Sequence, residues 1–299
     1  MRCRPCPLVL RLTTPAMPEG HTLHRLAREL TTVFGGRVVE ASSPQGRFAG
    51  SAALVTDQVL VGAEAWGKHL FVEFSSDQFP DDRFVHVHLG LYGRFDVHAD
   101  VPAVPEPVGQ VRLRLATEHA YADLRGATVC ELLTAAERDV VVARSGPDPL
   151  RDDADPAVAW ERIRRSKAPI GGLLMDQSVL AGVGNVYRAE VLFRHRIDPF
   201  RPGSTLRVGQ WRAMWDDLVV LMRDGVRTGR IDTVRDEHTP EAMGRPPRRD
   251  DHGGEVYVYR RNGMPCHVCG RAVRTAELQG RNLFWCSQCQ RRYRSRALQ

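Results

Sequence analysis

Four cysteines near the C-terminal end constrain the fold more than any other feature. They form two C-x2-C pairs, Cys266/Cys269 and Cys286/Cys289, separated by sixteen residues. Each pair can grip a metal ion from one tight turn, and the intervening segment is long enough for a hairpin that brings the second pair back. The spacing predicts one zinc ion (Zn2+) bound by four thiolates, with two disulfides or buried free thiols as alternatives. Four protein ligands leave no open position, so the predicted site is structural and not catalytic.

Arginines surround this predicted hairpin. Residues 255–299 hold nine arginines against two glutamates, and Phe284, Trp285 and Tyr293 lie among them. Such a surface favours a polyanion, most simply a nucleic-acid backbone, although a solvated basic tail is the alternative. The basicity is local, because Arg2, Arg4 and Arg11 supply three of the six net positive charges of the whole chain.

Length and composition indicate an ordinary globular protein. A chain of 299 residues can bury two or three cores, and 42% hydrophobic with 26% charged residues excludes disorder throughout. Nothing in the seven cysteines suggests a disulfide framework, which fits a reduced, cytoplasmic setting. No apolar run is long enough for a membrane span, so we expect no membrane partner.

The first part of the chain predicts one helix followed by a β-sandwich, in a multi-domain α+β protein. From Thr22 the apolar residues recur at the spacing of an amphipathic helix, which Gly35 and Gly36 end. Short alternating segments with Gly and Pro turns then predict strands at 38–41, 59–63, 69–74, 84–89 and 111–116. We assign residues 17–145 to this β-sandwich.

The next part changes to helical periodicity. We predict helices at 156–166, 170–176, 185–195 and 208–225, within a helical domain at 146–231. The segment 177–185 carries Gly182 and Gly184 at its bend and is longer than an ordinary helix-turn-helix turn, so we predict a helix–two-turn–helix arrangement. Asn185 is read as an N-cap, and the free N–H groups of that helix as an anion site for a phosphate.

Two segments flank these domains without a core of their own. Residues 232–255, rich in charge, Pro and Gly, are predicted to be a linker or mobile loop before the zinc-finger domain at 256–299, which a strand at 256–259 would enter. Residues 1–16 have too short an apolar core for a signal peptide. We expect them to be a disordered leader or to reflect a misassigned start.

Motifs that could carry chemistry occur at four places along the chain. In order they are Met17-Pro18-Glu19-Gly20, Gly67-Lys68, Gly182-Val-Gly184-Asn185-Val-Tyr187, and Gly280-Arg281-Asn282-Leu-Phe284-Trp285-Cys286. Taken singly, Pro18 and Glu19 are routine residues at a helix start, and Lys68 is an ordinary hairpin lysine. Together with the cysteines, the set closely resembles the formamidopyrimidine-DNA glycosylase/endonuclease VIII family of base-excision enzymes. The resemblance covers residues 17 to about 290, and Gly20 is closest to the bacterial endonuclease VIII branch.

The resemblance implies a catalytic role for four residues. Pro18 matches the family's nucleophile, whose secondary amine attacks C1′ of the damaged nucleotide to form a Schiff base. Glu19 matches the acid that protonates the opening sugar, and Lys68 the lysine that assists β-elimination. Arg281 matches the zinc-hairpin arginine that grips phosphate and assists δ-elimination. Apart from any family, amine attack at a sugar carbon needs an unprotonated amine, a carboxyl to move protons and cations for the phosphates, and these residues supply each.

The resemblance also implies DNA contacts. Asn185 and Arg144 match residues that contact phosphates beside the lesion. The target base must leave the stack to be reached, and the loop of Gly90, Leu91 and Tyr92 resembles the one that fills the gap. Gly90 stands where endonuclease VIII relatives usually have a larger polar residue.

The position of Pro18 raises a chemical requirement. When Met17 precedes it, the Pro18 nitrogen is a tertiary amide and cannot form a Schiff base. We therefore expect translation to begin at Met17 with removal of that methionine, or cleavage before activity.

The resemblance implies a bifunctional DNA glycosylase/AP lyase of base excision repair that acts on oxidised bases, most of all pyrimidines, by β,δ-elimination. It also implies that residues 17–145 form the catalytic domain and residues 146–231 the DNA-binding domain. The enzyme's expected partner is double-stranded DNA with an oxidised-base or abasic lesion, and it is expected to be a monomer. A zinc-containing DNA-binding protein without glycosylase activity is one alternative. A zinc-ribbon interaction module is another, but it explains only the C-terminal end.

Overall fold

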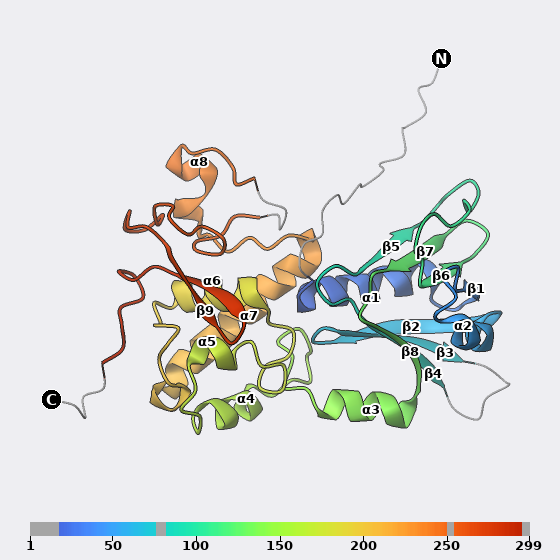
Figure 1. Cartoon of the computed structure of the whole chain (residues 1–299), viewed down its shortest axis with the longest axis horizontal. Coiled ribbons are helices and arrows are strands. Elements are labelled where there is room, and N and C mark those ends of the chain that lie inside the picture. The colour runs from blue at the N-terminus through green and yellow to red at the C-terminus, as the bar shows by residue number, and fades with distance from the viewer. Residues whose placement is uncertain (1–17, 76–81, 250–253, 295–299) are drawn as a thin grey trace, which may run out of the picture.

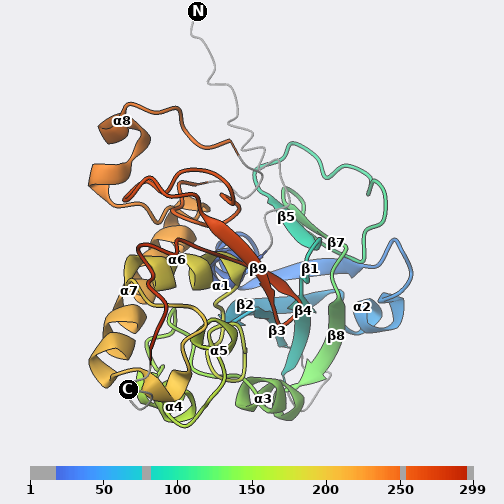
Figure 2. The ribbon, with the colours of Figure 1, turned by 60° about the vertical axis from the view of Figure 1, so that its left-hand side comes forward.

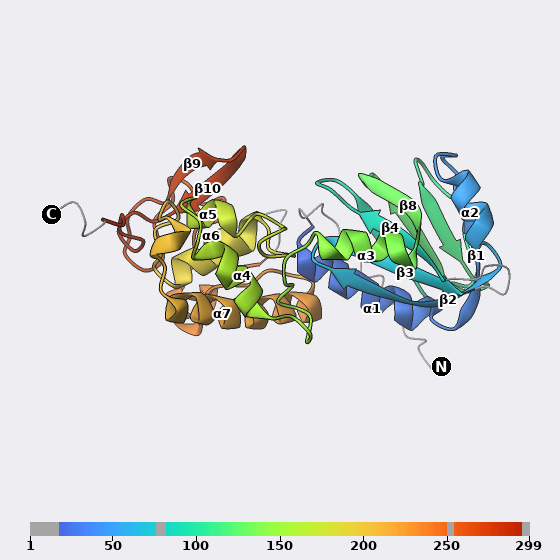
Figure 3. The same cartoon turned by 90° about the horizontal axis from the view of Figure 1, so that it is seen from below.

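The computed structural model describes residues 18–75, 82–249 and 254–294. The predicted leader at 1–16 and Met17 lie outside the described residues. Figure 1 shows two lobes side by side, one built mainly of strands from the first half of the chain and one built of helices with the C-terminal hairpin. Figure 3, seen from below, shows the same two lobes meeting at the N-terminal end of α1 (Gly20–Phe34). The predicted multi-domain α+β class is confirmed.

The described residues of the first lobe form eight antiparallel strands. They pair in the order β5-β7-β6-β1-β2-β3-β4-β8, and β1 joins the two layers, because residues 37–39 pair with β2 whereas residues 40–42 pair with β6. A continuous ladder thereby folds into the predicted sandwich around one core. The strands are β1 (Arg37–Ser42), β2 (Gln58–Trp66), β3 (His69–Ser75), β4 (Arg83–His88), β5 (Arg94–His98), β6 (Leu113–Ala116), β7 (Tyr121–Arg125) and β8 (Val129–Thr134).

In the part of the chain that the structure describes, three helices accompany this sheet. The apolar stripe of α1 is buried against β2, with Leu23, Leu30 and Phe34 at 0–1% exposure, and the helix ends at Gly35 as predicted. The short α2 (Ala49–Val55) packs against β1. The helix α3 (Ala135–Ala143), which was not predicted, begins at a reciprocal capping box.

Five of the strands were predicted, with small shifts at their ends, whereas β5, β7 and β8 were not. The strand β7 places Asp123 in the interior at 2% exposure, a residue that strands disfavour. Arg114 on the neighbouring β6 binds both Asp123 carboxylate oxygens at 2.7 and 2.8 Å. This buried ion pair compensates the charge of Asp123. Because a charged residue stands at a buried position, the alternation of apolar residues does not predict this strand.

The helical lobe packs its elements around the long helix α7. Its helices are α4 (Pro156–Ile163), α5 (Ile170–Leu173), α6 (Asn185–Arg194), η1 (Gly203–Thr205) and α7 (Val208–Thr228). Trp211, Tyr187 and Leu192 are 0–1% exposed in the core. The helix α5 ends earlier than the predicted 170–176, because the Asp176 carboxylate binds the backbone N–H and hydroxyl of Ser178 and favours a turn.

The segment before the hairpin differs from the prediction. Residues 256–259 do not form the predicted strand, because the N–H groups of Tyr257, Val258 and Tyr259 all donate to the carboxylate of Glu190, at 2.7, 2.9 and 2.8 Å. Amides directed at one carboxylate cannot pair with a neighbouring strand. The predicted linker at 232–255 contains η2 (Asp236–His238) and α8 (Pro240–Met243), and its residues 250–253 lie outside the described residues.

The C-terminal hairpin joins β9 (Arg274–Leu278) to β10 (Arg281–Trp285). Its two-residue turn, Gln279 and Gly280, has φ values of 51° and 71°, the conformation that suits a tight antiparallel hairpin. The strand β10 packs on α6, and Figure 2 shows β9 crossing in front of the helical lobe towards the other lobe. Among the described residues, no helix has both the length and the apolar character needed to cross a membrane.

Candidate active site at the junction of the lobes

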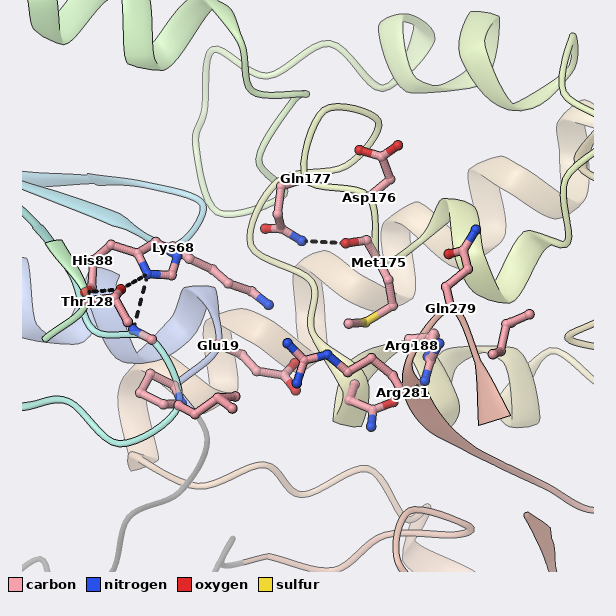
Figure 4. A pocket seen from close by; sticks show the side chains of 15 residues that line it. Glu19, Lys68, His88, Thr128, Met175, Asp176, Gln177, Arg188, Gln279 and Arg281 are labelled. Atoms are coloured by element: carbon pink, nitrogen blue, oxygen red, sulfur yellow. Dashed lines mark hydrogen bonds between the residues drawn. The ribbon is translucent and has the colours of Figure 1, made fainter. Parts of the chain in front are cut away.

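A cavity of about 590 Å³ opens where the two lobes and the hairpin tip meet. It brings together residues from the start of α1, the β2–β3 turn, the loop after β4, the loop before α6 and the hairpin (Figure 4). All four predicted catalytic residues line it. The lining comprises Pro18, Glu19, Lys68, His88, Gly90, Leu91, Thr128, Met175, Asp176, Gln177, Asn185, Arg188, Leu278, Gln279 and Arg281.

The carboxylate of Glu19, which precedes α1, lies at the N-terminus of α6. Its side chain is 1% exposed, and its carboxylate accepts hydrogen bonds from the backbone N–H groups of Gly184 at 2.9 Å, Val186 at 2.7 Å and Tyr187 at 3.4 Å. The predicted anion site at this helix is therefore filled by Glu19, and its N–H groups are not free for a phosphate. The N-cap residue is Gly184, so the predicted N-cap role of Asn185 is wrong.

Close backbone contact explains the glycines around Glu19. A Cβ atom at Gly184 would lie 2.4 Å from the Glu19 carboxyl carbon, and one at Gly20 would lie 2.8 Å from the Cα atom of Gly182. The Gly20 N–H also donates to the Gly182 carbonyl at 2.8 Å. These close contacts fix the positions of Pro18 and Glu19 relative to the N-terminus of α6, and Pro18 lines the cavity.

Lys68 follows a tightly anchored turn. The Gly67 N–H donates to the buried Asp148 carboxylate at 2.7 Å, and the same oxygen contacts His24 Nε2 at 2.7 Å. Gly67 has a φ of 59°, and a Cβ atom there would lie 2.9 Å from the Cβ atom of Ala181. This anchoring fixes the backbone from which Lys68 extends into the cavity.

Burial tunes the two central ionisable groups in opposite directions. Burial raises the pKa of Glu19, although the nearby Lys68 charge and the three backbone N–H groups favour its ionised form. Burial lowers the pKa of Lys68, and the charges of Arg281 and Arg188 lower it further, while Glu19 opposes this shift. A carboxyl that holds a proton more readily and an amine that loses one more readily are suited to general acid–base chemistry.

The hairpin is fastened to α6 by a buried polar network. The Asn185 side-chain amide donates to the Asn282 carbonyl at 3.0 Å, and Arg188 donates to that carbonyl at 3.1 Å and to the Asn185 side-chain oxygen. Arg188 is 1% exposed. Asn185, which the resemblance assigns to a phosphate, is thus engaged with the residue next to Arg281. Figure 4 shows Lys68 and Arg281 extending towards Glu19 from different elements.

The predicted gap-filling loop lies partly at the cavity. Gly90 and Leu91 line it, whereas Tyr92 is 80% exposed and is not among the lining residues. Gly90 has a φ of 70°, and a Cβ atom there would lie 2.4 Å from the Thr128 methyl group, so a larger residue does not fit this backbone. Arg144 follows α3 at an exposed position and does not line the cavity.

Several lining residues were not predicted. His88 is one, and Figure 4 shows its ring bound to the loop: the Gly90 N–H donates to His88 Nδ1 at 3.1 Å, while Thr128 donates its hydroxyl to the His88 carbonyl. Arg188 and Gln279 are others. None has a sequence signal of its own, because each depends on contacts between distant elements.

The four predicted zinc ligands converge. The Sγ atoms of Cys266, Cys269, Cys286 and Cys289 all lie within 4.8 Å of one another, with 3.9 Å between Cys266 and Cys289 and 3.4 Å between Cys269 and Cys286. Tetrahedral ligands at the usual Zn–S distance of about 2.3 Å lie about 3.8 Å apart, so the cluster fits one zinc ion.

Comparison with known proteins decides the family. Residues 17–130 match the formamidopyrimidine-DNA glycosylase N-terminal domain, 145–236 its H2TH domain, and 263–292 the zinc finger found in FPG and IleRS. The Mycobacterium tuberculosis protein named endonuclease 8 1 is 54% identical over 276 residues, which cover 92% of this chain and all of the relative. The chain belongs to the formamidopyrimidine-DNA glycosylase/endonuclease VIII family. The four thiolates are accordingly the ligands of one structural zinc ion.

Other relatives agree with this assignment. A probable endonuclease 8 2 of Streptomyces coelicolor is 32% identical, covering 92% of this chain and 94% of the relative. The MutM (Fpg) structure from Thermus thermophilus superposes with a TM-score of 0.69 at 25% identity, covering 91% of this chain and 98% of that one. A Lactococcus lactis Fpg solved with lesion-containing DNA shares the fold, with a TM-score of 0.70 at 21% identity, covering 92% and 100% of the two chains. The enzyme class of the family is DNA glycosylase with AP lyase activity.

Proposed function

We propose that this enzyme excises oxidised bases, principally oxidised pyrimidines, from double-stranded DNA through a Schiff base on Pro18, and then cuts the strand by β,δ-elimination. One observation carries the proposal: Pro18 and the buried carboxyl of Glu19 share one cavity with Lys68 and Arg281. The pyrimidine preference is proposed from the resemblance to the endonuclease VIII branch, and two of the relatives carry the name endonuclease 8. These relatives are bacterial, and we place the enzyme in the bacterial cytoplasm as a monomer acting at DNA lesions.

The first step is base release. The lone pair of the Pro18 amine attacks C1′ of the flipped nucleotide, and the damaged base leaves with the bonding electrons. The Pro18 nitrogen then loses its proton, which neutralises the departing base. Glu19 gives its proton to the sugar ring oxygen as the ring opens, which yields the iminium on Pro18. The raised pKa of Glu19 supports this role, because the group must hold a proton before the reaction.

Elimination follows from the iminium. Removal of a C2′ proton expels the 3′ phosphate, and a second elimination expels the 5′ phosphate. Lys68 is the group we assign to assist the first proton transfer, since its lowered pKa favours the free amine. We assign Arg281 to hold the phosphate that departs, because a guanidinium can bind a phosphate through two parallel hydrogen bonds.

DNA contacts surround this centre. We assign Leu91 and Tyr92 to the space that the flipped base vacates, since both are partly exposed and Leu91 borders the cavity. Asn185 and Arg144 are assigned to phosphates beside the lesion. Asn185 would have to exchange its bond to the Asn282 carbonyl for this contact, or act through the hairpin that it holds.

The reactive form must begin with Pro18. An amide nitrogen has no basic lone pair, so the chain that still carries Met17 cannot form the iminium at this position. We propose that the active enzyme is the form in which residues before Pro18 have been removed.

Borohydride trapping tests this proposal. Duplex DNA with one oxidised pyrimidine is incubated with two proteins, the full 299-residue chain and the form produced from Met17, after intact mass has shown which N-terminus each carries. A covalent adduct only with the form that begins at Pro18 is the expected result. If neither protein gives an adduct, on this lesion or on an abasic site, the proposal is refuted and the alternative, DNA binding without catalysis, is favoured.

A further inference from the structure

The sheet of the first lobe carries a hydrogen-bonded chain of three side chains that the proposed chemistry does not use. His86 Nδ1 lies 2.9 Å from a carboxylate oxygen of Glu131, and His86 Nε2 lies 2.9 Å from His69 Nδ1. His86 and Glu131 are direct partners on β4 and β8. His69 begins β3 and shares a peptide bond with Lys68. The chain therefore reaches the residue next to the proposed elimination group.

The middle residue of this hydrogen-bonded chain, His86, is buried and tightly packed, whereas its outer residue, Glu131, is exposed to solvent. His86 is 3% exposed, and its ring stacks on Phe71 with the centroids 4.9 Å apart. The Glu131 side chain is 52% exposed. A buried ring between two partners and a stacked phenyl group has no alternative rotamer available without losing these contacts.

Hydrogen-bond logic fixes the tautomers along the chain. The ionised Glu131 can only accept, so His86 Nδ1 carries the proton. Neutral His86 then accepts at Nε2, and His69 must donate from Nδ1. The outcome is one defined arrangement, in which the remaining nitrogen of His69, Nε2, is unprotonated. A carboxylate that orients an imidazole in this way is a common device for fixing a ring next to a reactive centre.

The inner end of the chain borders the cavity wall. The His69 and His88 rings lie 5.3 Å apart, centroid to centroid, and His88 lines the cavity. His88 is itself fixed, because its Nδ1 accepts from the Gly90 N–H. The two oriented rings, His69 at the start of β3 and His88 at the end of β4, thus lie close to Lys68.

We propose that Glu131, His86 and His69 are positioning residues for Lys68. Glu131 and His86 orient the His69 ring, and the His69 ring in turn fixes the adjoining backbone from which the Lys68 side chain enters the cavity. This inference rests on the proposed function, in which Lys68 assists elimination. Gly67 is anchored on the other side of Lys68 by Asp148. The two anchors together leave the lysine backbone little freedom.

The chain also has a defined response to acid. Burial lowers the pKa of His69 to about 4, with the neighbouring His86 and His88 acting in the same direction. Burial lowers the pKa of His86 as well, although Glu131 opposes the shift, and that of His88, to which the Lys68 charge contributes. All three rings are therefore neutral near pH 7. Protonation of His86 on the acid side makes its Nε2 a donor and forces His69 to reverse its tautomer.

Glu131→Gln is the sharpest test, because the side chain keeps its shape and lies at the surface. The Pro18 form is measured in single turnover on an abasic-site duplex, with β-elimination and DNA affinity recorded separately from pH 4.5 to 8. His86→Phe and the double variant are measured alongside it. Glu118→Gln, at a glutamate whose side chain is 87% exposed and which lies outside the chain, is the matched control.

We expect Glu131→Gln to slow β-elimination about 10-fold, a fraction of the roughly 10²–10⁴ that a general acid or base supplies, at unchanged DNA affinity. The acid limb of its pH profile should move to lower pH, because loss of the carboxylate lowers the pKa of His86 further. His86→Phe should be at least as slow, and the double variant no slower than His86→Phe. A merely structural effect would lower the rate equally at every pH.

The outcomes separate the two proposals. Wild-type rates and an unshifted acid limb in both single variants, in a protein that traps through Pro18, would overturn the positioning role alone. Absence of trapping and cleavage by the parent Pro18 form would overturn the proposed function itself. Equal losses of β-elimination rate in Glu118→Gln and Glu131→Gln would also refute the positioning role, because Glu118 is not part of the hydrogen-bonded chain.

Discussion

Gly184→Ala is predicted to disable base excision without replacing any of the proposed catalytic residues. The added Cβ atom would lie 2.4 Å from the carboxyl carbon of Glu19 and 2.6 Å from its Cγ and Oε1 atoms. Carbon atoms in contact are about 3.5–4.0 Å apart, so the carboxyl must move by roughly 1 Å or more. Gly184 has an ordinary negative φ of −117°, so the effect comes from the collision and not from backbone strain.

The size of both effects follows from the contacts. Overpacking of a close-packed interior costs about 1–3 kcal/mol of stability, and a misplacement of 1 Å can cost about 10²-fold in rate. We therefore expect a modest fall in the free energy of unfolding and a loss of excision of about 10²-fold. DNA affinity and zinc content should stay near wild type, because the hairpin and its ligands are not touched.

A double-mutant cycle isolates the collision. In Glu19→Ala the carboxylate is gone, so the methyl group of Gly184→Ala has space, and the stability losses of the pair should be smaller than the sum of the single losses. Coupling between contacting residues is commonly about 0.5–3 kcal/mol. Gly209→Ala is the control, since Gly209 lies in α7 with nothing within 4 Å of a Cβ atom.

The assay is single-turnover release of an oxidised pyrimidine, with thermal or denaturant unfolding measured on the same samples. Wild-type excision by Gly184→Ala would refute the argument that Glu19 is held at this point. Strict additivity of the stability losses in the cycle would show that the collision is absent.

Three further changes test the scaffold. Cys286→Ser should lose the zinc ion, measured by metal analysis, and weaken DNA binding, because the site is tied to the folding of the hairpin; full affinity without zinc would contradict this. Glu190→Gln should lower stability by about 2 kcal/mol, because an amide nitrogen replaces one acceptor of buried N–H groups; the same change at an exposed glutamate should be neutral. Asp217→Asn tests a pH effect: burial alone would raise the pKa of Asp217, but hydrogen bonds from His195 and Arg194 hold it at about 2. A depressed pKa gives stability that is present above the unfolded value of about 3.9 and lost as pH falls towards 2, so the variant should be less stable near pH 6 and approach wild type near pH 2. An equal difference in unfolding free energy at both pH values would refute it.

Local signals predicted much of the fold. Cysteine spacing predicted the four ligands, and apolar periodicity predicted α1 and α7 close to their observed bounds. One usable signal was overlooked: Thr134 and Glu137 have the spacing of a capping box, which marks the start of α3.

Other features depend on contacts between elements and left no local trace. The strand β7 contains Asp123, whose partner Arg114 lies directly opposite it on the neighbouring β6. Residues 256–259 have the composition of a strand, but Glu190, on another element, captures their amides. Propensity cannot anticipate a carboxylate that arrives from 67 residues away.

The active site shows the same division. Motif resemblance gathered Pro18, Glu19, Lys68 and Arg281, and the structure places all four at one cavity. The partner of the α6 N-terminus could not be predicted, because the sequence near Gly184 is equally suited to bind a phosphate or a carboxylate. The lobe contact that selects Glu19 exists only in the folded chain.

The most direct test of the central claim is to locate the covalent bond. The borohydride-reduced adduct of the Pro18 form with lesion DNA is digested and its peptides are sequenced by mass spectrometry. The account predicts that the sugar fragment is attached to the N-terminal peptide at Pro18. Attachment to the peptide that contains Lys68, with Pro18 unmodified, would contradict it.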